Sequence, residues 1–200
     1  MLAFEATTAD PTQKPRDADA ALMAAIAHGD RRSFAELYER HRRPLYRLAY
    51  GVLLDVDEAR DAVQEAFLRL HRAAPDWEPR AQVGTWLYRV VLNHCLGLRQ
   101  RLRRIFSPPA ERAPATPEDR AVLGQAIGVV ERSLADLPPK QRAVACLCLE
   151  AELPPAEIAP LVDLTPNATR VNLHRALARL RADLAAAGFD TPPDPMLETN

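Results

Sequence analysis

A proline-rich segment near the middle of the chain is the feature that most constrains how this sequence can fold. Residues 105–117, IFSPPAERAPATP, contain four prolines and show no apolar periodicity. Proline fixes its own φ angle, lacks an N–H donor and restricts the residue before it, so this run favours an extended, semi-rigid linker. The chain is therefore predicted to form two small domains, 18–104 and 118–187, with loose tails at 1–17 and 188–200.

Apolar residues of the first domain recur every three or four positions, which predicts helices. A long helix is expected over residues 34–53, bent at Pro44. The acidic run 55–58 then suits the first turn of a second helix. This second helix is predicted to bury Ala59, Val63, Ala66, Phe67 and Leu70 and to expose Asp61, Gln64, Glu65, Leu68 and Arg72. A third helix, over about 83–104, is predicted to bury Val83, Leu87, Val90, Val91, Leu98 and Leu102.

The second domain is also predicted to be helical, so the fold class is all-α. Its first helix opens after Thr116 with a proline and two acids and has the apolar set Val122, Leu123, Ala126, Ile127, Val130, Leu134 and Leu137. Paired prolines at 138–139 and 154–155 start and end the next helix. A short helix around Ile158, a turn with a buried Leu164 and a last helix from Pro166 to about Ala187 follow. Segment 155–184 is therefore a helix-turn-helix by physical description.

Composition excludes several classes of protein. Hydrophobic residues make up 48% and charged residues 26% of the 200 residues, as in ordinary globular chains. No apolar run approaches the ~18 residues of a membrane span and the N-terminus does not resemble a signal peptide, so we expect a cytoplasmic protein without membrane insertion. The three cysteines form no CxxC pair and are expected to be reduced and buried. Scattered histidines and the absence of phosphate-binding glycine motifs predict no catalysis and no cofactor.

Arginine is the residue type that points to nucleic acid. The net charge is only −1, but 24 of the 26 basic residues are Arg, and they cluster near residues 99–104 and 170–181. Guanidinium groups suit phosphates and base edges. In a helix-turn-helix the start of the second helix meets the major groove, and the candidates there are Asn167, Thr169, Arg170, Asn172, His174 and Arg175. A solvated helix face or a hairpin that binds no DNA stays open.

Two further surfaces carry weaker signals. Trp86 and Tyr88 lie near Arg80, Arg89 and Asn93, and such mixtures of rings and cations suit single-stranded nucleic acid, although Trp86 fits a core position equally well. The polar face of the second helix, with its exposed Leu68, fits either a protein contact or a solvated surface.

Taken together, these segments resemble the extracytoplasmic function class of bacterial sigma factors. DEARDAVQEAFLRLHRA is similar to the polymerase-binding stretch of that family, and GTWLYRVVLNHCL is similar to its TWLYRIAxN signature. The run from 137, with LPxxQR, AEIA and LHRAxxxLR in order, resembles region 4. The resemblance covers about 18–186 and implies a region 2 helical bundle and a region 4 helix-turn-helix joined by the linker.

The resemblance implies partners and roles for particular residues. It implies core RNA polymerase and promoter DNA as partners and an anti-sigma factor as regulator. The residues that match the polymerase-docking motif are Asp61, Gln64, Glu65, Phe67 and Leu68. Those that match the helix of the family that recognises and opens the upstream edge of the bubble are Trp86, Tyr88, Arg89 and Asn93, and Arg80, Arg99 and Arg103 are further DNA-binding candidates. Those assigned to the minus thirty-five element are Thr165, Asn167, Thr169, Arg170, Asn172, His174, Arg175 and Arg179.

The sequence also departs from the family pattern within the helix-turn-helix. Pro160 replaces a polar residue, Asp163 stands where many members have glycine, and Val171 and Asn172 occupy positions of small polar or basic residues. A divergent minus thirty-five sequence and weakened DNA binding both fit these departures. Two other function classes stay open: a helical regulator that binds an operator without polymerase, and a module that binds only proteins.

Overall fold

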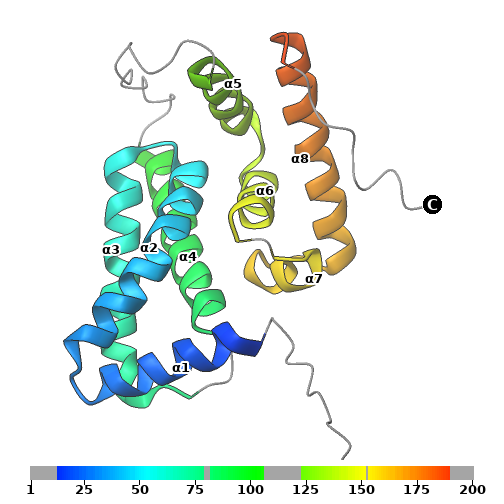
Figure 1. Ribbon diagram of the computed structural model, residues 1–200. Helices are drawn as coiled ribbons and strands as arrows, with labels where there is room; N and C mark the ends of the chain where they lie inside the picture. The colour runs from blue at the N-terminus through cyan, green and yellow to red at the C-terminus, as the bar shows by residue number, and fades with distance from the viewer. Residues whose placement is uncertain (1–12, 79–81, 106–122, 152, 190–200) are drawn as a thin grey trace, which may run out of the picture.

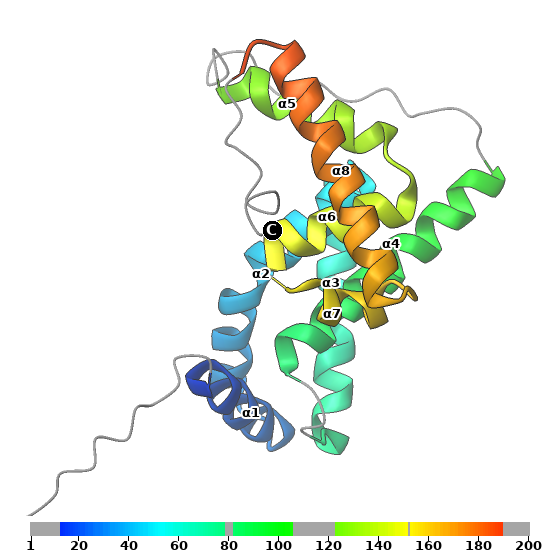
Figure 2. The same cartoon turned by 90° about the vertical axis from the view of Figure 1, so that its right-hand side faces the viewer.

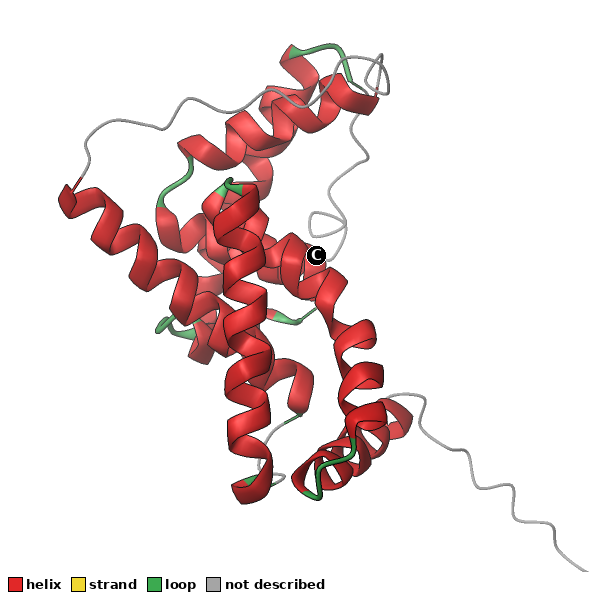
Figure 3. Ribbon diagram, turned by 90° about the vertical axis from the view of Figure 1, so that its left-hand side faces the viewer, coloured by secondary structure: helices red, strands yellow, loops and turns green. Residues whose placement is uncertain are grey.

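The computed structural model describes residues 13–78, 82–105, 123–151 and 153–189, and every regular element in them is helical (Figures 1 and 3). The all-α prediction is therefore confirmed. The helices of the first half are α1 (Gln13–Ala27), α2 (Arg31–Leu53), α3 (Val56–Ala73) and α4 (Val83–Ile105). Those of the second half are α5 (Leu123–Asp136), α6 (Pro139–Ala151), α7 (Pro155–Ile158) and α8 (Pro166–Ala186). Two 3₁₀ turns, η1 (Ala74–Asp76) and η2 (Ala159–Leu161), complete the described elements.

Helix α2 is the centre of the first bundle, because α1, α3 and α4 all pack against it. Local chemistry sets where the helices begin. The side chain of Asp30 accepts from the backbone N–H of Arg32 at 3.0 Å, and that of Asp55 accepts from the N–H groups of Asp57 and Glu58, both at 3.0 Å. Such caps satisfy donors that have no partner within the helix. α2 continues through Pro44 and ends at Leu54, which has a left-handed φ of 58°.

The inward faces predicted from helical spacing are confirmed for α3 and for the described part of α4. Residues of α3 that were expected inside are buried: Ala59, Val63, Ala66, Phe67 and Leu70. In α4 the buried set includes Val83, Leu87, Val90 and Val91, joined by Leu92 and Cys95. The side chains of Leu98 and Leu102 lie outside the described residues. Both helices therefore present one apolar stripe to α2.

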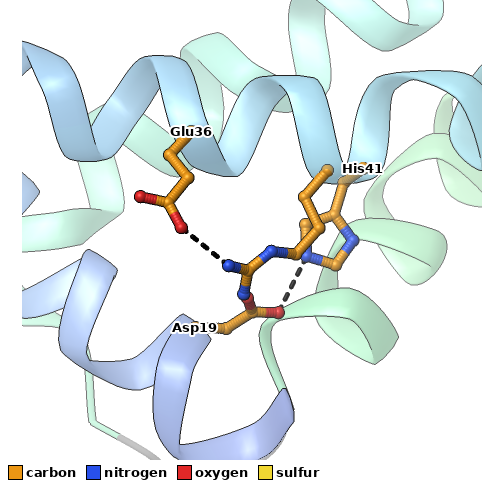
Figure 4. Close-up of polar contacts among 4 residues, drawn as sticks. Asp19, Glu36 and His41 are labelled. Carbon is orange, nitrogen blue, oxygen red and sulfur yellow. Dashed lines mark hydrogen bonds and ion pairs between the residues drawn. The ribbon is translucent and has the colours of Figure 1, made fainter.

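Helix α1 begins at Gln13, so residues 13–17, which were expected in the tail, are helical. One polar cluster ties this helix to α2 (Figure 4). The buried carboxylate of Asp19 pairs with the Arg40 guanidinium, and one of its oxygens lies 2.8 Å from Nε2 of His41. Arg40 also donates to Glu36 at 2.8 Å. Burial acts to raise the pKa of Asp19, but His41 and Arg40 outweigh it and hold the pKa below its ordinary value.

The second half is a helix-turn-helix unit in which α8 packs against α5, α6 and α7 (Figure 2). Thr165 caps α8, since its Oγ1 accepts from the N–H of Ala168 at 3.2 Å. Leu164 is half-buried against the core. Ile127, a member of the apolar set predicted for α5, is 52% exposed, whereas Val129 is buried. Apolar residues surround α5 on several sides, so periodicity alone does not decide which face packs.

The two halves share one cluster of buried side chains, because α6 lies against α2 (Figures 1 and 2). None of the helices in the described part of the chain combines the length and hydropathy needed to cross a bilayer. The predicted linker, 105–117, falls almost wholly outside the described residues, as do residues 1–12 and 190–200.

Replacing Asp19 by Asn is expected to lower the free energy of unfolding by roughly 1.5–3 kcal/mol at pH 7, the range for hydrogen bonds to charged groups. Because the folded pKa lies below the unfolded one, the carboxylate stabilises the fold above the ordinary pKa of Asp. That contribution is lost as the pH falls through the lowered folded pKa. Urea unfolding of wild type and Asp19→Asn should therefore show a difference in the free energy of unfolding that becomes smaller at acidic pH.

The control is Asp57→Asn, which removes an exposed carboxylate that pairs with Arg60 at 3.3 Å. Exposed pairs contribute only about 0–1 kcal/mol, so this change should have a small effect. Equal decreases in the free energy of unfolding for Asp19→Asn and Asp57→Asn would contradict the stabilising role of the Asp19 cluster.

Candidate nucleic-acid and protein interfaces

The first turns of α8 present a polar, basic surface to solvent. Asn167, Arg170, His174 and Arg175 are all exposed there. Figures 1 and 2 show α8 on the outer side of the molecule, with α6 between it and the α1–α4 bundle. Arg179, further along α8, pairs with Asp183 and approaches Asp136, whereas Arg170 and Arg175 lie exposed near the start of the helix. The guanidinium groups of Arg170 and Arg175 are therefore accessible to phosphates or base edges.

Three residues predicted to contact DNA have other partners in the structure. Thr169 is completely buried, and its hydroxyl donates to the carbonyl of Thr165 at 3.0 Å. The amide of Asn172 donates to the carbonyl of Ala168 at 2.8 Å. Arg179 pairs with Asp183 at 2.8 Å and lies 3.5 Å from a carboxylate oxygen of Asp136. In this conformation the Thr169 hydroxyl is therefore turned back to the helix and away from solvent.

The turn before α8 accommodates the unusual residues of this sequence. Asp163 adopts a left-handed φ of 52°, which glycine takes without strain and Asp tolerates better than most residues. Its carbonyl accepts from Nζ of Lys140 at 3.2 Å. Pro160 is the second residue of η2, where the short turn does not need a hydrogen bond from its backbone nitrogen. The departures at 160 and 163 therefore preserve the helix-turn-helix backbone.

Helix α4 presents Arg89 and Asn93 to solvent. Trp86 is half-buried, and its ring meets Trp77 edge-on with centroids 5.6 Å apart, so it is partly a packing residue. Tyr88 is also half-buried against the core. Arg80 lies outside the described residues, and the same holds for the side chains of Arg99 and Arg103.

A groove of about 640 Å³ runs between α2 and α3. Aromatic rings form much of its wall, and the Tyr38 and Phe67 ring centroids are 4.7 Å apart. Tyr38 and Leu68 are 38% and 44% exposed, which is unusual for large apolar side chains. The residues that line the groove are Phe34, Tyr38, Arg42, Arg43, Tyr46, Arg60, Val63, Gln64, Phe67 and Leu68. An apolar floor ringed by arginines fits an amphipathic, acidic protein segment.

A second hollow, of about 550 Å³, lies between α3 and α4 and is lined by Asp61, Gln64, Glu65, Leu68, Arg69, Asn93, His94 and Gly97. Gln64 and Leu68 line both hollows, so they stand on the ridge between them. A hydrogen bond from Arg69 at 2.7 Å holds the pKa of Glu65 below its ordinary value. Phe67 is only 3% exposed, so this predicted docking residue supports the groove from below.

Sequence reasoning missed the contribution of α2 to this groove. Phe34, Tyr38, Arg42 and Tyr46 recur every four residues, which places them along one side of a helix. Apolar periodicity alone assigns Phe34 and Tyr38 to the buried face, although a large residue at the edge of that face can also line a groove. The sequence signal that could have indicated the groove was the four-residue spacing of three aromatic rings and an arginine.

No group of three or more His, Cys, Asp or Glu side chains suited to a metal ion occurs in the part of the chain that the structure describes. Cys95 and Cys146 are buried as expected, and Cys148 is half-buried. Burial raises the pKa of both Cys95 and Cys146 to about 12. These two thiols therefore stay protonated near neutral pH and have little nucleophilic character.

The left-handed turn at Asp163 allows a stability test. Asp163→Val should destabilise the protein by roughly 1–2 kcal/mol, the cost of a left-handed conformation for a residue with a bulky Cβ. Asp163→Gly is the matched variant and should leave the stability within about 1 kcal/mol of wild type, because relief of strain offsets the greater freedom of the unfolded chain. Thermal unfolding measures both, and equal stabilities would contradict the strained turn.

Comparison with known proteins gives these surfaces a family context. Residues 37–105 match the family Sigma-70 region 2, and residues 127–180 match Sigma-70, region 4. The chain is 35% identical over 162 residues to the ECF RNA polymerase sigma factor SigM of Mycobacterium tuberculosis (strain ATCC 25618 / H37Rv), covering 81% of this chain and 82% of that protein. It is 26% identical over 173 residues to the ECF RNA polymerase sigma factor SigW of Bacillus subtilis, covering 80% and 92%.

Two solved structures are similar to the whole arrangement. The structure of CnrH in complex with the cytosolic domain of CnrY has a TM-score of 0.65 and 27% identity, covering 85% of this chain and 99% of that chain. The sigma factor RpoE in complex with the anti-sigma factor NepR from Bartonella quintana has a TM-score of 0.62 at 19% identity, covering 76% and 96%. The second likeness concerns the fold alone.

Proposed function

Because the chain belongs to the extracytoplasmic function class of RNA polymerase sigma factors, we propose that its two helical units divide promoter reading between them while docked on core RNA polymerase. As a sigma factor it directs promoter-specific initiation of transcription. The observation that carries the proposal is the occurrence of both sigma regions, in order, in one chain whose α8 exposes Arg170 and Arg175. Its role is binding rather than catalysis, and it acts in the cytoplasm, where polymerase works.

The helix-turn-helix reads the minus thirty-five element through the first turns of α8. Asn167 and Arg170 lie where major-groove contacts are made, and Arg175 one turn further is placed for the phosphate backbone. His174 shares this exposed surface. Thr169 acts only by holding the start of the helix, through its hydrogen bond to Thr165.

Helix α4 reads the minus ten element. Arg89 and Asn93 are exposed along it, and the amide of Asn93 suits the edge of an extruded base. Trp86 and Tyr88 keep part of their rings at the surface, where bases can stack. The opposite side of the helix is buried against α2, which holds these side chains on a rigid support.

Core RNA polymerase docks on the ridge formed by Gln64 and Leu68 and on the groove beside it. The two exposed apolar side chains, Tyr38 and Leu68, give such an interface its desolvated centre, and the surrounding arginines favour an acidic partner. An anti-sigma factor is the proposed regulator, since the similar protein CnrH was solved in complex with the cytosolic domain of CnrY.

The function is tested by transcription with purified core polymerase on a promoter library. A sigma factor produces defined start sites that depend on its presence. An operator-binding regulator would instead bind duplex specifically without polymerase, and a protein-binding module would give no DNA response at all.

Arg175→Ala should weaken promoter complexes and reduce the dependence of their stability on salt. Removing one cation that meets a phosphate lowers the slope of log K against log[salt] by about 1. The measurement is the lifetime or affinity of the polymerase–promoter complex over a range of salt concentrations.

Arg179→Ala is the matched control on the same helix, because that guanidinium already pairs with Asp183 and approaches Asp136. Its removal should change the salt slope less than the removal of Arg175. An unaltered slope for Arg175→Ala would show that this side chain meets no phosphate.

Leu68→Ala should weaken polymerase binding by about tenfold or more, as truncation of a central apolar contact does. The side chain is largely exposed, so helicity and unfolding should change little. Val56→Ala is the control, because Val56 is a comparably exposed apolar residue of the same helix and lines neither hollow. Equal polymerase affinities for the Leu68 and Val56 variants would show that polymerase does not dock on α3 through Leu68.

A further inference from the structure

The first turns of α8 carry one continuous exposed face, on the outer side of the molecule (Figure 2). The exposed positions follow the spacing i, i+3, i+4, i+7 and i+8, which places them on one side of a helix. This surface, here called the reading face, consists of Asn167, Arg170, Val171, His174 and Arg175. The opposite side of α8 is buried through Leu173, Ala176 and Leu180, so the reading face has a rigid support.

Val171 is the apolar residue of the reading face. Its side chain is 40% exposed, whereas the other large apolar residues of α8 are buried or half-buried, namely Leu173, Leu177, Leu180 and Leu184. Helical spacing places Asn167 one turn before Val171, and His174 and Arg175 one turn after it. Val171 therefore lies at the centre of the face, with polar and basic side chains around it. A partner that covers this face must offer an apolar group at its centre and negative charge at its border.

The polar side chains next to Val171 along the chain bond to the helix itself. The hydroxyl of Thr169 donates to the carbonyl of Thr165 at 3.0 Å. The amide of Asn172 donates to the carbonyl of Ala168 at 2.8 Å. The surface between the exposed residues Asn167 and His174 therefore presents the methyl groups of Val171 rather than these donors.

Duplex DNA supplies both features that such a partner needs. Phosphates line the major groove, and the base edges within it carry hydrogen-bond donors and acceptors and, at thymine, a C5 methyl group. A valine that covered a donor or acceptor would displace water without replacing its hydrogen bond, which is unfavourable. A valine against the thymine methyl removes apolar surface of both partners from water. The centre of the reading face therefore favours thymine over the other bases.

We propose that Val171 specifies thymine at one position of the minus thirty-five element, through contact between its methyl groups and the C5 methyl of that base. This inference rests on the proposed function and adds the identity of one base to it. Asn167 and Arg170 read neighbouring bases by hydrogen bonds, and Arg175 meets the phosphate backbone. A valine in a helix keeps almost a single rotamer, so little entropy is lost when the contact forms.

Deoxyuridine substitution tests the proposal, because deoxyuridine pairs as thymidine does but lacks the C5 methyl. The promoter library first gives the minus thirty-five element that wild type prefers. Each thymine of that element, on either strand, is then replaced in turn, and the affinity of the polymerase–promoter complex is measured. Wild type should lose about fourfold at one position, since burial of one methyl contributes about 0.8 kcal/mol and 1.4 kcal/mol is a factor of ten.

Val171→Ser removes both methyl groups, and serine and valine have similar helix propensities, so α8 should persist. The variant should bind the thymine promoter at least about fourfold more weakly than wild type and lose nothing further with deoxyuridine at the critical position. Its salt dependence should equal that of wild type, because Val171 meets no phosphate. Val171→Ile keeps the methyl groups and should keep the sensitivity to deoxyuridine.

Leu149→Ser is the matched control. It removes an apolar side chain of α6 that is 57% exposed and lies outside the reading face. This variant should show the same fourfold effect of deoxyuridine as wild type, because the ratio of the two affinities depends only on the contact with the thymine methyl.

Wild type that tolerated deoxyuridine at every thymine, or that preferred an element without thymine, would overturn the proposal. A Val171→Ser protein as sensitive to deoxyuridine as wild type would overturn it too. If wild type produced no defined start sites with core polymerase, the proposed function itself would fail. Defined start sites without the methyl effect would remove only the role of Val171.

Discussion

Burial of helix α2 on several sides is the constraint on which the rest of the structure depends. Its flanks are covered by α1, α3 and α4, and its C-terminal half is covered again by α6 of the other sigma unit. Leu45, Leu48, Ala49 and Val52 are essentially inaccessible as a result. Each neighbour then gains a fixed support: α3 carries the docking ridge, α4 carries Arg89, and α6 carries the helix-turn-helix. Helix α2 therefore fixes the positions of both binding surfaces.

The features that the sequence predicted well are those decided by neighbours along the chain. The acidic run that begins at Asp55 and the pair Thr165–Pro166 can serve only the helix that follows them, so the starts of α3 and α8 were readable, whereas the cap at Asp30 was not predicted. The stripe from Ala59 to Leu70 also follows from spacing alone, because the other face of α3 is strongly polar. The order of the sigma motifs also indicated the family, and the family implied that two helical units occur in one chain.

The features that were missed depend on what packs against a helix. Ile127 and Val129 are equally apolar, and only the position of α8 decides that Val129 is inside. Thr169 looks like a base contact until its hydroxyl is seen to bond Thr165. Six successive buried residues on α6 carry no periodic signal, because a helix covered on two sides has no single apolar stripe. The packing of α6 against α2 was therefore beyond sequence reasoning.

Dividing the contacts between two units also explains how a nearly neutral chain can be selective. With a net charge of −1 and few exposed arginines on α8, one unit alone binds duplex weakly. Once both units are held on polymerase, the second contact forms at a high effective concentration and the weak contacts multiply. Binding to other DNA therefore stays weak, whereas the polymerase-bound protein holds its promoter strongly.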